Sequence, residues 1–192
     1  MEIKPVNEKR YFLISNLLKG IFYLILVLVV FLLLRKFSSE EQRYAWFGSI
    51  YNNLPLVMAL FVSSEILFGI IPPEVFMLWS LETRLLGDYF MSIGYLSLIS
   101  YAAGFLNFNF GKWVKNKDFI RKTKWPWVRK YLGLFKKYGA YLVVVGSITP
   151  LPFSAVALFC GMGNLNSKKY LWFSLLRIVR FFVYALVLWS LY

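Results

Sequence analysis

Two acidic residues flank a double proline in a strongly apolar stretch of this 192-residue chain: Glu65 lies before Pro72–Pro73, and Glu74 follows directly. An ionised side chain at the centre of a bilayer costs about 2.5–3.5 kcal/mol by insertion measurements. Two prolines remove two backbone N–H donors and break a helix, which a membrane tolerates only where protein or a water-filled cavity pairs with the freed groups. The stretch therefore predicts a broken helical element near mid-membrane, where transporters place their substrate and ion sites.

The positions of the two acids suggest what each could do. Glu74 comes directly after the prolines, so we expect it in the first turn of a half-helix, where the helix dipole favours negative charge. Glu65 lies deeper in apolar sequence, where burial favours the protonated form and makes it a candidate proton carrier. We expect Glu65 and Glu74 to form a proton-coupling or substrate site. The alternative is a structural ion pair between Glu65 and one of two arginines near the C-terminus, Arg177 or Arg180.

These two arginines lie in the last apolar stretch of the chain. Arg177 and Arg180 are three residues apart, so a helix presents both on one face. Guanidinium groups bind phosphate through paired, charge-assisted hydrogen bonds. The spacing is consistent both with binding of a lipid phosphate and with structural pairing to the acids.

A second proline-containing break interrupts a later apolar stretch at Thr149, Pro150 and Pro152. The first break has the corresponding features at Pro72 and Pro73. At the second break, the Thr149 and Ser154 hydroxyls and the unwound carbonyl groups are candidates to line a polar site. Pairing with the freed backbone is the commoner role of such hydroxyls in membrane helices and remains the alternative.

The composition is typical of a membrane protein. The chain is 59% hydrophobic, whereas soluble domains contain about 45–50% apolar residues. We predict an all-α integral membrane protein with two parts, residues 1–53 and 54–192. The first part holds a transmembrane helix at 11–34 and an interfacial linker. The second holds a hairpin at about 54–86, a span at 88–110, a basic loop at 112–137, a second hairpin at about 138–162 and a span at 169–191.

The two interrupted segments are each followed by a full-length span. Counting crossings from a cytoplasmic N-terminus, one hairpin enters from outside and the other from inside. The pattern predicts an inverted repeat of two re-entrant helical hairpins, the arrangement in which transporter sites form at the repeat interface. A continuous, kinked crossing over 54–86 is the alternative for the first hairpin.

Positive charge is concentrated in one segment. Residues 112–137 contain ten lysines and arginines against Asp118 alone, so they carry nine of the thirteen net positive charges. Beside membrane spans this predicts a cytoplasmic loop by the positive-inside rule, with the N-terminus on the same side. The loop should also attract anionic lipid head groups, by about 1 kcal/mol per basic residue near the surface. We expect no nucleic-acid partner.

Several classes of chemistry lack the residues they need. The chain has no histidine and a single cysteine, Cys160. Imidazole bases, the commonest metal ligand and an intrachain disulfide are therefore excluded. We expect no metal, no cofactor and no enzyme activity, with an intramembrane lipid-modifying enzyme as an alternative.

Several short sequence pieces occur in a characteristic order: Glu65, Pro72–Pro73–Glu74, Tyr101–Ala–Ala–Gly104, Phe135–Lys–Lys–Tyr–Gly139, Pro150, Gly161–Met162, Phe173 and Arg177–Ile–Val–Arg180–Phe. Through these pieces the sequence, over roughly residues 50–190, resembles the DedA/VTT superfamily, also called the SNARE-associated or vacuole-membrane family. The resemblance implies facing re-entrant hairpins and movement of lipids between leaflets. Bacterial members are associated with undecaprenyl phosphate or phosphatidylethanolamine and with the proton gradient, and eukaryotic relatives with phospholipid scrambling.

One part of the family pattern is missing. Many bacterial members carry two arginines around the proline of the second hairpin, in an Arg–Phe–x–Pro–x–x–Arg arrangement. The corresponding stretch here, Ser147 to Phe153, contains no arginine. Arg177 and Arg180 are therefore the candidates to bind phosphate in its place.

The expected function is that of a lipid translocase, a flippase or scramblase for a phosphate-bearing lipid such as undecaprenyl phosphate or a phospholipid. Proton coupling through Glu65 and Glu74 and a bacterial inner-membrane location go with this expectation. A non-transporting scaffold that acts through the basic loop is the alternative. Membrane lipids are the expected partners, and a homo-oligomer is left open.

Overall fold

The computed structural model describes residues 52–67, 69, 71–115, 126–149 and 152–191, together with isolated positions between 18 and 50. Every regular element in these residues is a helix, so the all-α prediction is confirmed for this part of the chain. The predicted first span at 11–34 lies outside the continuously described residues. The helices are α3 (Leu54–Ile66), α4 (Pro73–Thr83), α5 (Tyr89–Lys115), α7 (Pro126–Ile148), α8 (Phe153–Met162), α9 (Ser167–Ser174) and α10 (Leu176–Leu191).

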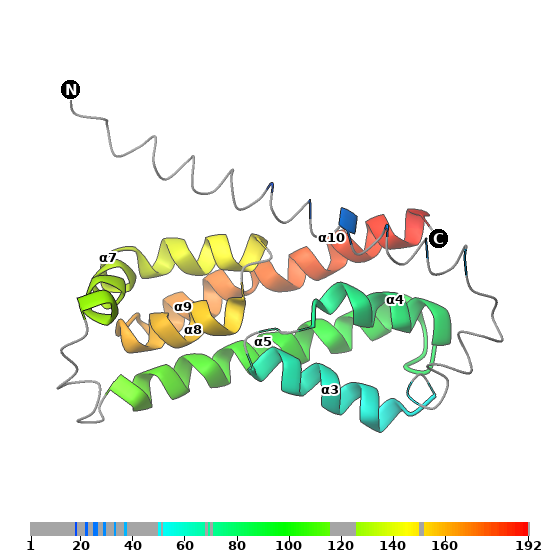
Figure 1. Ribbon diagram of the computed structural model, residues 1–192, viewed down its shortest axis with the longest axis horizontal. Coiled ribbons are helices and arrows are strands. Elements are labelled where there is room, and N and C mark those ends of the chain that lie inside the picture. Colours follow the sequence, from blue (N-terminus) through cyan, green and yellow to red (C-terminus); the bar gives the residue numbers. More distant parts are fainter. Residues whose placement is uncertain are drawn as a thin grey trace.

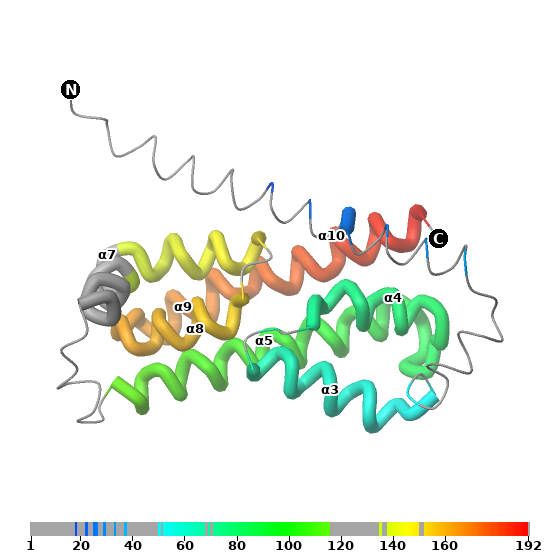
Figure 2. Tube along the Cα trace, in the orientation of Figure 1, coloured from blue at the N-terminus to red at the C-terminus, as the bar shows by residue number. Residues whose placement is uncertain are grey.

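Two helix pairs face each other along the molecule. In Figure 1, α3 and α4 run in opposite directions around one turn, and α7 and α8 do the same around another. The two pairs open towards opposite ends of the molecule, and their turns meet in the middle. The long helix α5 and the α9–α10 segment run lengthwise past both pairs, as the trace in Figure 2 also shows. The reversals favour hairpins over a kinked crossing, while re-entry into a bilayer and the inverted repeat stay predictions.

The helix bounds differ from the predicted ones around the basic segment. Helix α5 continues through Lys115, and α7 already begins at Pro126. The predicted loop at 112–137 is thus helical at both ends, and the second helix pair begins at 126 rather than 138. Proline is well suited to the first position of a helix, and aromatic and apolar residues recur at helical spacing between the lysines that follow. The last predicted span, 169–191, begins at Ser167 and is divided at Leu175 into α9 and α10.

The first turn is closed by local hydrogen bonds. Helix α3 ends at Ile66, and Gly69 then adopts a φ of +65°, a left-handed conformation that suits glycine. The hydroxyl of Ser64 accepts from the amide of Ile71 at 2.8 Å and donates to its carbonyl at 3.1 Å. Pro72 and Pro73 occupy the N-cap and first helical position of α4, where no backbone N–H is needed.

The second turn uses the same residue types differently. Helix α7 ends at Ile148, and Thr149 bonds back to the carbonyl of Val145 through its amide at 2.8 Å and its hydroxyl at 2.6 Å. Pro152 is the N-cap of α8. Pro150, predicted as part of this break, lies outside the described residues. The Thr149 hydroxyl therefore pairs with its own helix, which was the alternative role expected for it.

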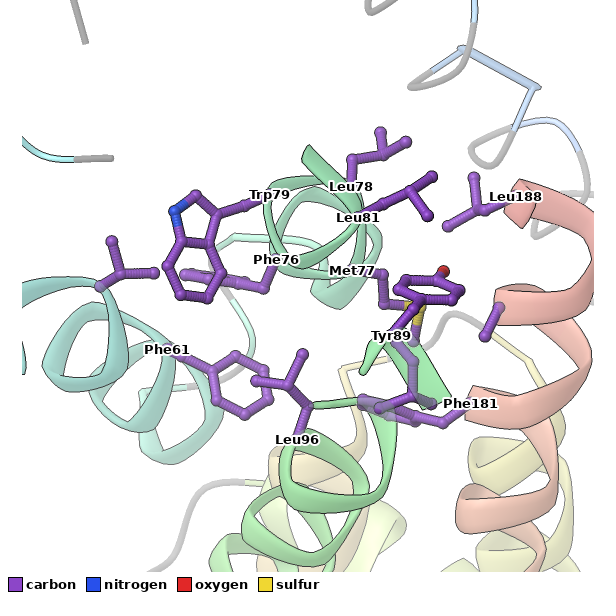
Figure 3. Close-up of a cluster of buried hydrophobic side chains, with 13 residues drawn as sticks. Phe61, Phe76, Met77, Leu78, Trp79, Leu81, Tyr89, Leu96, Phe181 and Leu188 are labelled. Carbon is purple, nitrogen blue, oxygen red and sulfur yellow. The ribbon is translucent and has the colours of Figure 1, made fainter. Parts of the chain in front are cut away.

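Apolar cores lie on either side of the turns. One core joins α3, α4, the first half of α5 and α10 from Phe181 onwards, and includes the edge-to-face rings of Phe61 and Phe76, 4.9 Å apart (Figure 3). The other joins the second half of α5 to α7, α8 and α9 around the stacked rings of Phe108 and Tyr170, 4.1 Å apart. The two cores hold the hairpin turns between them in a fixed middle layer.

Helices α5 and α8 touch through their backbones. A Cβ placed on Gly111 would lie 2.0 Å from the carbonyl oxygen of Leu158, and one on Gly161 would lie 2.0 Å from that of Phe108. Gly94, on the same helix as Gly111, has nothing within 4 Å of such a Cβ. Gly111 and Gly161 therefore allow the close approach that fixes the second hairpin against α5.

This contact predicts opposite effects of one substitution at two positions of α5. Gly111→Ala should destabilise the protein by about 1–3 kcal/mol, because the new methyl group forces two backbones apart. Gly94→Ala is the matched control and should be neutral or stabilise slightly, since alanine is the better helix former. Thermal unfolding in detergent measures both, and equal melting temperatures for the two variants would contradict the close contact.

Candidate functional site

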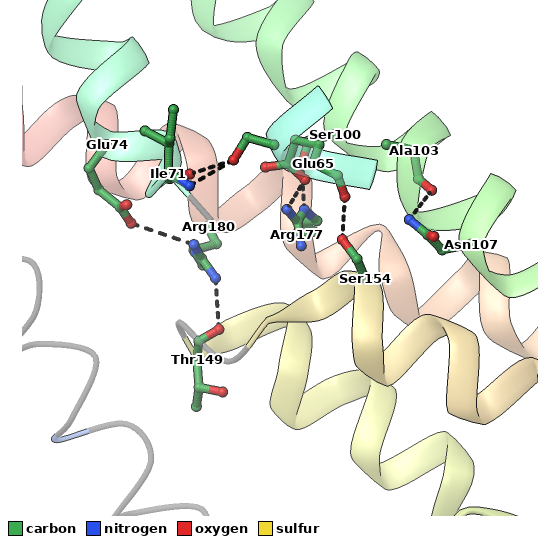
Figure 4. A network of polar contacts seen from close by, with 11 residues as sticks. Glu65, Ile71, Glu74, Ser100, Ala103, Asn107, Thr149, Ser154, Arg177 and Arg180 are labelled. Atoms are coloured by element: carbon green, nitrogen blue, oxygen red, sulfur yellow. Dashed lines mark hydrogen bonds and ion pairs between the residues drawn. The ribbon is translucent and has the colours of Figure 1, made fainter. Parts of the chain in front are cut away.

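A buried polar network lies where the two turns meet (Figure 4). It contains five residues that the sequence singled out, and they come from four helices or their ends. All are nearly inaccessible, with exposed fractions of 1–7%. Within apolar surroundings, charged groups persist only when they are paired and hydrogen-bonded. The five are Glu65, Glu74, Thr149, Arg177 and Arg180.

Arg177 is held in a closed ring of contacts. Its Nη2 donates to Oε2 of Glu65 in a buried ion pair. Its Nε donates to the hydroxyl of Ser100 at 2.5 Å, and that hydroxyl donates to the same Glu65 oxygen at 2.8 Å. The guanidinium carbon lies 4.6 Å from the ring centre of Phe153 and 5.9 Å from that of Phe181. This ring ties α10 to α3 and α5, with aromatic faces completing the enclosure.

The second hairpin also contacts Glu65 through the main chain. The hydroxyl of Ser154, in the first turn of α8, donates to the carbonyl oxygen of Glu65. Carbonyl groups in the last turn of a helix lack partners within it, and Glu65 lies in the last turn of α3. The C-terminal end of α3 is therefore bound by α8 of the opposing hairpin.

Arg180 connects both turns, but less tightly. Its Nη1 donates to the carbonyl of Thr149 at 2.7 Å, whereas its Nη2 lies 3.5 Å from Oε1 of Glu74. Its Nε has no hydrogen-bond partner among the described residues, although the atom is buried. The guanidinium carbon lies 5.1 Å from the ring centre of Tyr184. Arg180 is thus an enclosed cation with donor capacity to spare.

The structure brings together the acids and arginines expected from the sequence and separates them into two pairs. Glu65 pairs with Arg177, and Glu74, in the first turn of α4, faces Arg180. The prolines shape the turns without contributing polar side chains.

Ser100 was not predicted from the sequence as a member of the network. Small residues at helical spacing on α5, such as Ser97, Ser100, Ala103 and Gly104, were the signal that could have marked its face as buried.

The described helices define a class of protein. Two helical stretches, α5 at 89–115 with 27 residues and α9 with α10 at 167–191 with 25 residues, are long and apolar enough to cross a membrane. Their outward faces expose large apolar side chains that suit contact with lipid, whereas Arg177 and Arg180 lie inside. Exposed examples include Leu98, Leu106, Val179 and Leu186. A helical membrane protein with an enclosed ionic centre accounts for these features.

Comparison with known families agrees with this class. Residues 66–190 match the family model of the VTT domain, so the chain belongs to the DedA/VTT family of membrane proteins. The match covers both turns, α5 and the two arginines. No significant match was found among curated proteins or among solved structures.

The two ion pairs should differ in their contribution to stability. Glu65→Gln leaves Arg177 buried without its carboxylate and should lower the free energy of unfolding by about 3–5 kcal/mol. Glu74→Gln should cost less, roughly 1–3 kcal/mol, because its contact with Arg180 is long. Unfolding in mixed micelles of a mild detergent and SDS measures both values.

A double-mutant cycle isolates the pair itself. Glu65→Gln combined with Arg177→Gln should lower the free energy of unfolding by less than the sum of the single changes. Each single variant leaves one buried charge unpaired, whereas the double variant leaves none. Additive losses, or a larger loss for Glu74→Gln than for Glu65→Gln, would contradict the assignment of Glu65–Arg177 as the tighter pair.

Proposed function

We propose that the protein moves a phosphate-bearing lipid, such as undecaprenyl phosphate or a phospholipid, between the leaflets of a bacterial plasma membrane. The observation that carries the proposal is a pair of buried guanidinium groups at the meeting point of two opposed helix turns. Arginine binds phosphate bidentately, and a phosphate group is the part of such a lipid that the hydrocarbon layer excludes. A cation buried inside the helical domain would supply the charge that lets the head group cross.

The cost of burial supports a functional role. Replacing a buried ion pair by well-packed apolar residues is often neutral or stabilising. Two such pairs in one apolar domain are therefore poorly explained by stability alone. Transporters commonly place their sites near mid-membrane between broken helices, and the described network lies between the turns of two opposed helix pairs, which supports the proposal.

Proton coupling follows from the charge of the network. Glu65 and Glu74 balance Arg177 and Arg180, so the centre is neutral when all four are ionised. An arriving phosphate adds negative charge in a low-dielectric site, and protonation of one carboxylate restores the balance. We therefore propose that Glu65 or Glu74 takes up a proton as the lipid phosphate binds.

Basic residues at one end of the molecule support the proposed orientation. Lys112 and Lys115 end α5, and Lys168 and Lys169 lie in the first turn of α9. The Nζ of Lys112 donates to the hydroxyl of Ser167 at 2.6 Å, so both helix ends lie together. By the positive-inside rule this end, with the basic segment beyond α5, faces the cytoplasm.

A leaflet-resolved assay on proteoliposomes tests the transport proposal. Arg180→Gln should slow translocation of a fluorescent lipid phosphate by about tenfold or more, since a hydrogen bond to a charged group contributes roughly 1.5–3 kcal/mol. Arg84→Gln removes the same charge from an exposed position at the end of α4 and is the matched control. Wild-type vesicles that translocate no faster than empty ones would refute the proposal.

The same vesicles test proton coupling. An imposed pH gradient should change the rate of lipid translocation by the wild-type protein. Either Glu74→Gln or Glu65→Gln should abolish this effect of the gradient, and the variant that does so identifies the carboxylate that carries the proton. Lipid movement that is insensitive to the gradient in wild type and in both variants would identify passive scrambling.

The concentration of charge at 112–137 favours a scaffold as the second candidate function. A scaffold would bind acidic partners through this segment without moving lipid. Neutralising Arg121, Lys122 and Lys124 changes none of the residues of the buried network. If these changes abolish the cellular phenotype while Glu65→Gln, at normal protein levels, does not, the scaffold explains the protein better than transport.

A further inference from the structure

We propose that the two ion pairs divide the work: Arg177 and Glu65 fix the hairpins together, and Arg180 exchanges Glu74 for the phosphate group of a ligand. The lipid as the source of that phosphate rests on the proposed function. The exchange itself does not, because phosphate binding is measurable without transport.

Arg177 is committed to structural partners. Two of its nitrogen atoms are bonded to Glu65 and Ser100, which also bond to each other. The aromatic rings of Phe153 and Phe181 lie near the guanidinium carbon. A phosphate that bound Arg177 would have to break the hydrogen bonds that join α3, α5 and α10. This guanidinium is therefore the fixed one.

Arg180 has the properties of an exchangeable cation. Its contact with Glu74 is 3.5 Å long, beyond the usual 2.7–3.2 Å of an N–H···O hydrogen bond. Its Nε is buried without a partner among the described residues. A guanidinium offers five donors in a planar fork that matches two oxygens of a phosphate group. Phosphate would satisfy donors that the protein leaves idle.

The helix ends explain why Glu74, and not Glu65, can lose its arginine. Glu74 lies in the first turn of α4, where the helix dipole stabilises an anion. Glu65 lies in the last turn of α3, where the dipole disfavours one, so it depends on Arg177. Releasing Arg180 therefore leaves Glu74 in a favourable field, whereas releasing Arg177 would leave Glu65 in an unfavourable one.

The position of Arg180 also suits an arriving head group. Its firm bond is to the Thr149 carbonyl, at the turn of the second hairpin. The neighbouring residues Ile148 and Pro152 are exposed on the surface of the described structure. A phosphate that enters at this turn competes with Glu74 for the guanidinium of Arg180.

Binding to the purified, full-length protein in detergent tests the exchange. The probes are phosphatidic acid in mixed micelles and inorganic phosphate, with diacylglycerol as the lipid lacking phosphate. Glu74→Gln should bind phosphatidic acid about tenfold more tightly, because a neutral amide competes less well for Arg180. Arg180→Gln should lose the binding, and Arg180→Lys should keep part of it, since lysine has the charge without the fork.

Matched variants separate exchange from general charge effects and from misfolding. Glu82→Gln removes one negative charge from the other end of α4 and should leave affinity unchanged, as should Arg84→Gln. Folding of each variant is checked by its melting temperature. A folded Glu74→Gln variant with unchanged affinity for phosphatidic acid would overturn the exchange. So would a folded Arg180→Gln or Arg180→Lys variant that binds phosphatidic acid as tightly as the wild type.

The two probes identify the source of the phosphate. Binding of phosphatidic acid, with or without competition by inorganic phosphate, supports a lipid ligand. Binding of inorganic phosphate alone, tightened by Glu74→Gln, supports the exchange but contradicts the proposed lipid transport. If the protein translocates lipid but Glu74→Gln does not change its affinity for phosphate, the exchange is contradicted and the proposed transport is not.

Discussion

The pairing of four buried charges is the constraint on which the structure depends. Glu65 and Arg177 are almost wholly enclosed, and an unpaired charge at either position would be strongly unfavourable. Their contact requires the last turn of α3 to lie against the start of α10, with Ser100 of α5 between them. The two apolar cores then form on either side of this layer, and the hairpin turns can meet only there.

The local helix geometry makes the two pairs unequal. An anion in the last turn of a helix needs a cation, whereas one in the first turn is already stabilised. Glu65 and Glu74 illustrate the two cases within one hairpin, and their contacts with arginine are correspondingly tight and loose. In the proposed exchange, the Glu65–Arg177 pair stays fixed and the Glu74–Arg180 pair opens to a ligand. The family match places both pairs in the VTT domain or at its edge.

The sequence predicted the features that rest on local chemistry. Prolines marked both turns, and the cost of burying charge marked Glu65, Glu74, Arg177 and Arg180. The partner of each acid depends on how distant helices pack, which no local pattern contains, so the choice between Arg177 and Arg180 stayed open. Ser100 was missed because a single serine on an apolar span is uninformative, and only the row of small residues along α5 marks its face as buried. The start of α7 was misplaced because the lysines hid its helical spacing.

The most direct test of the account is an experimental structure of the protein with phosphatidic acid bound. The account predicts a phosphate group within hydrogen-bond distance of Arg180, with Glu74 displaced and the Glu65–Ser100–Arg177 ring unchanged. A phosphate bound only at the lysines around Lys112 and Lys168, with Glu74 still facing Arg180, would contradict it.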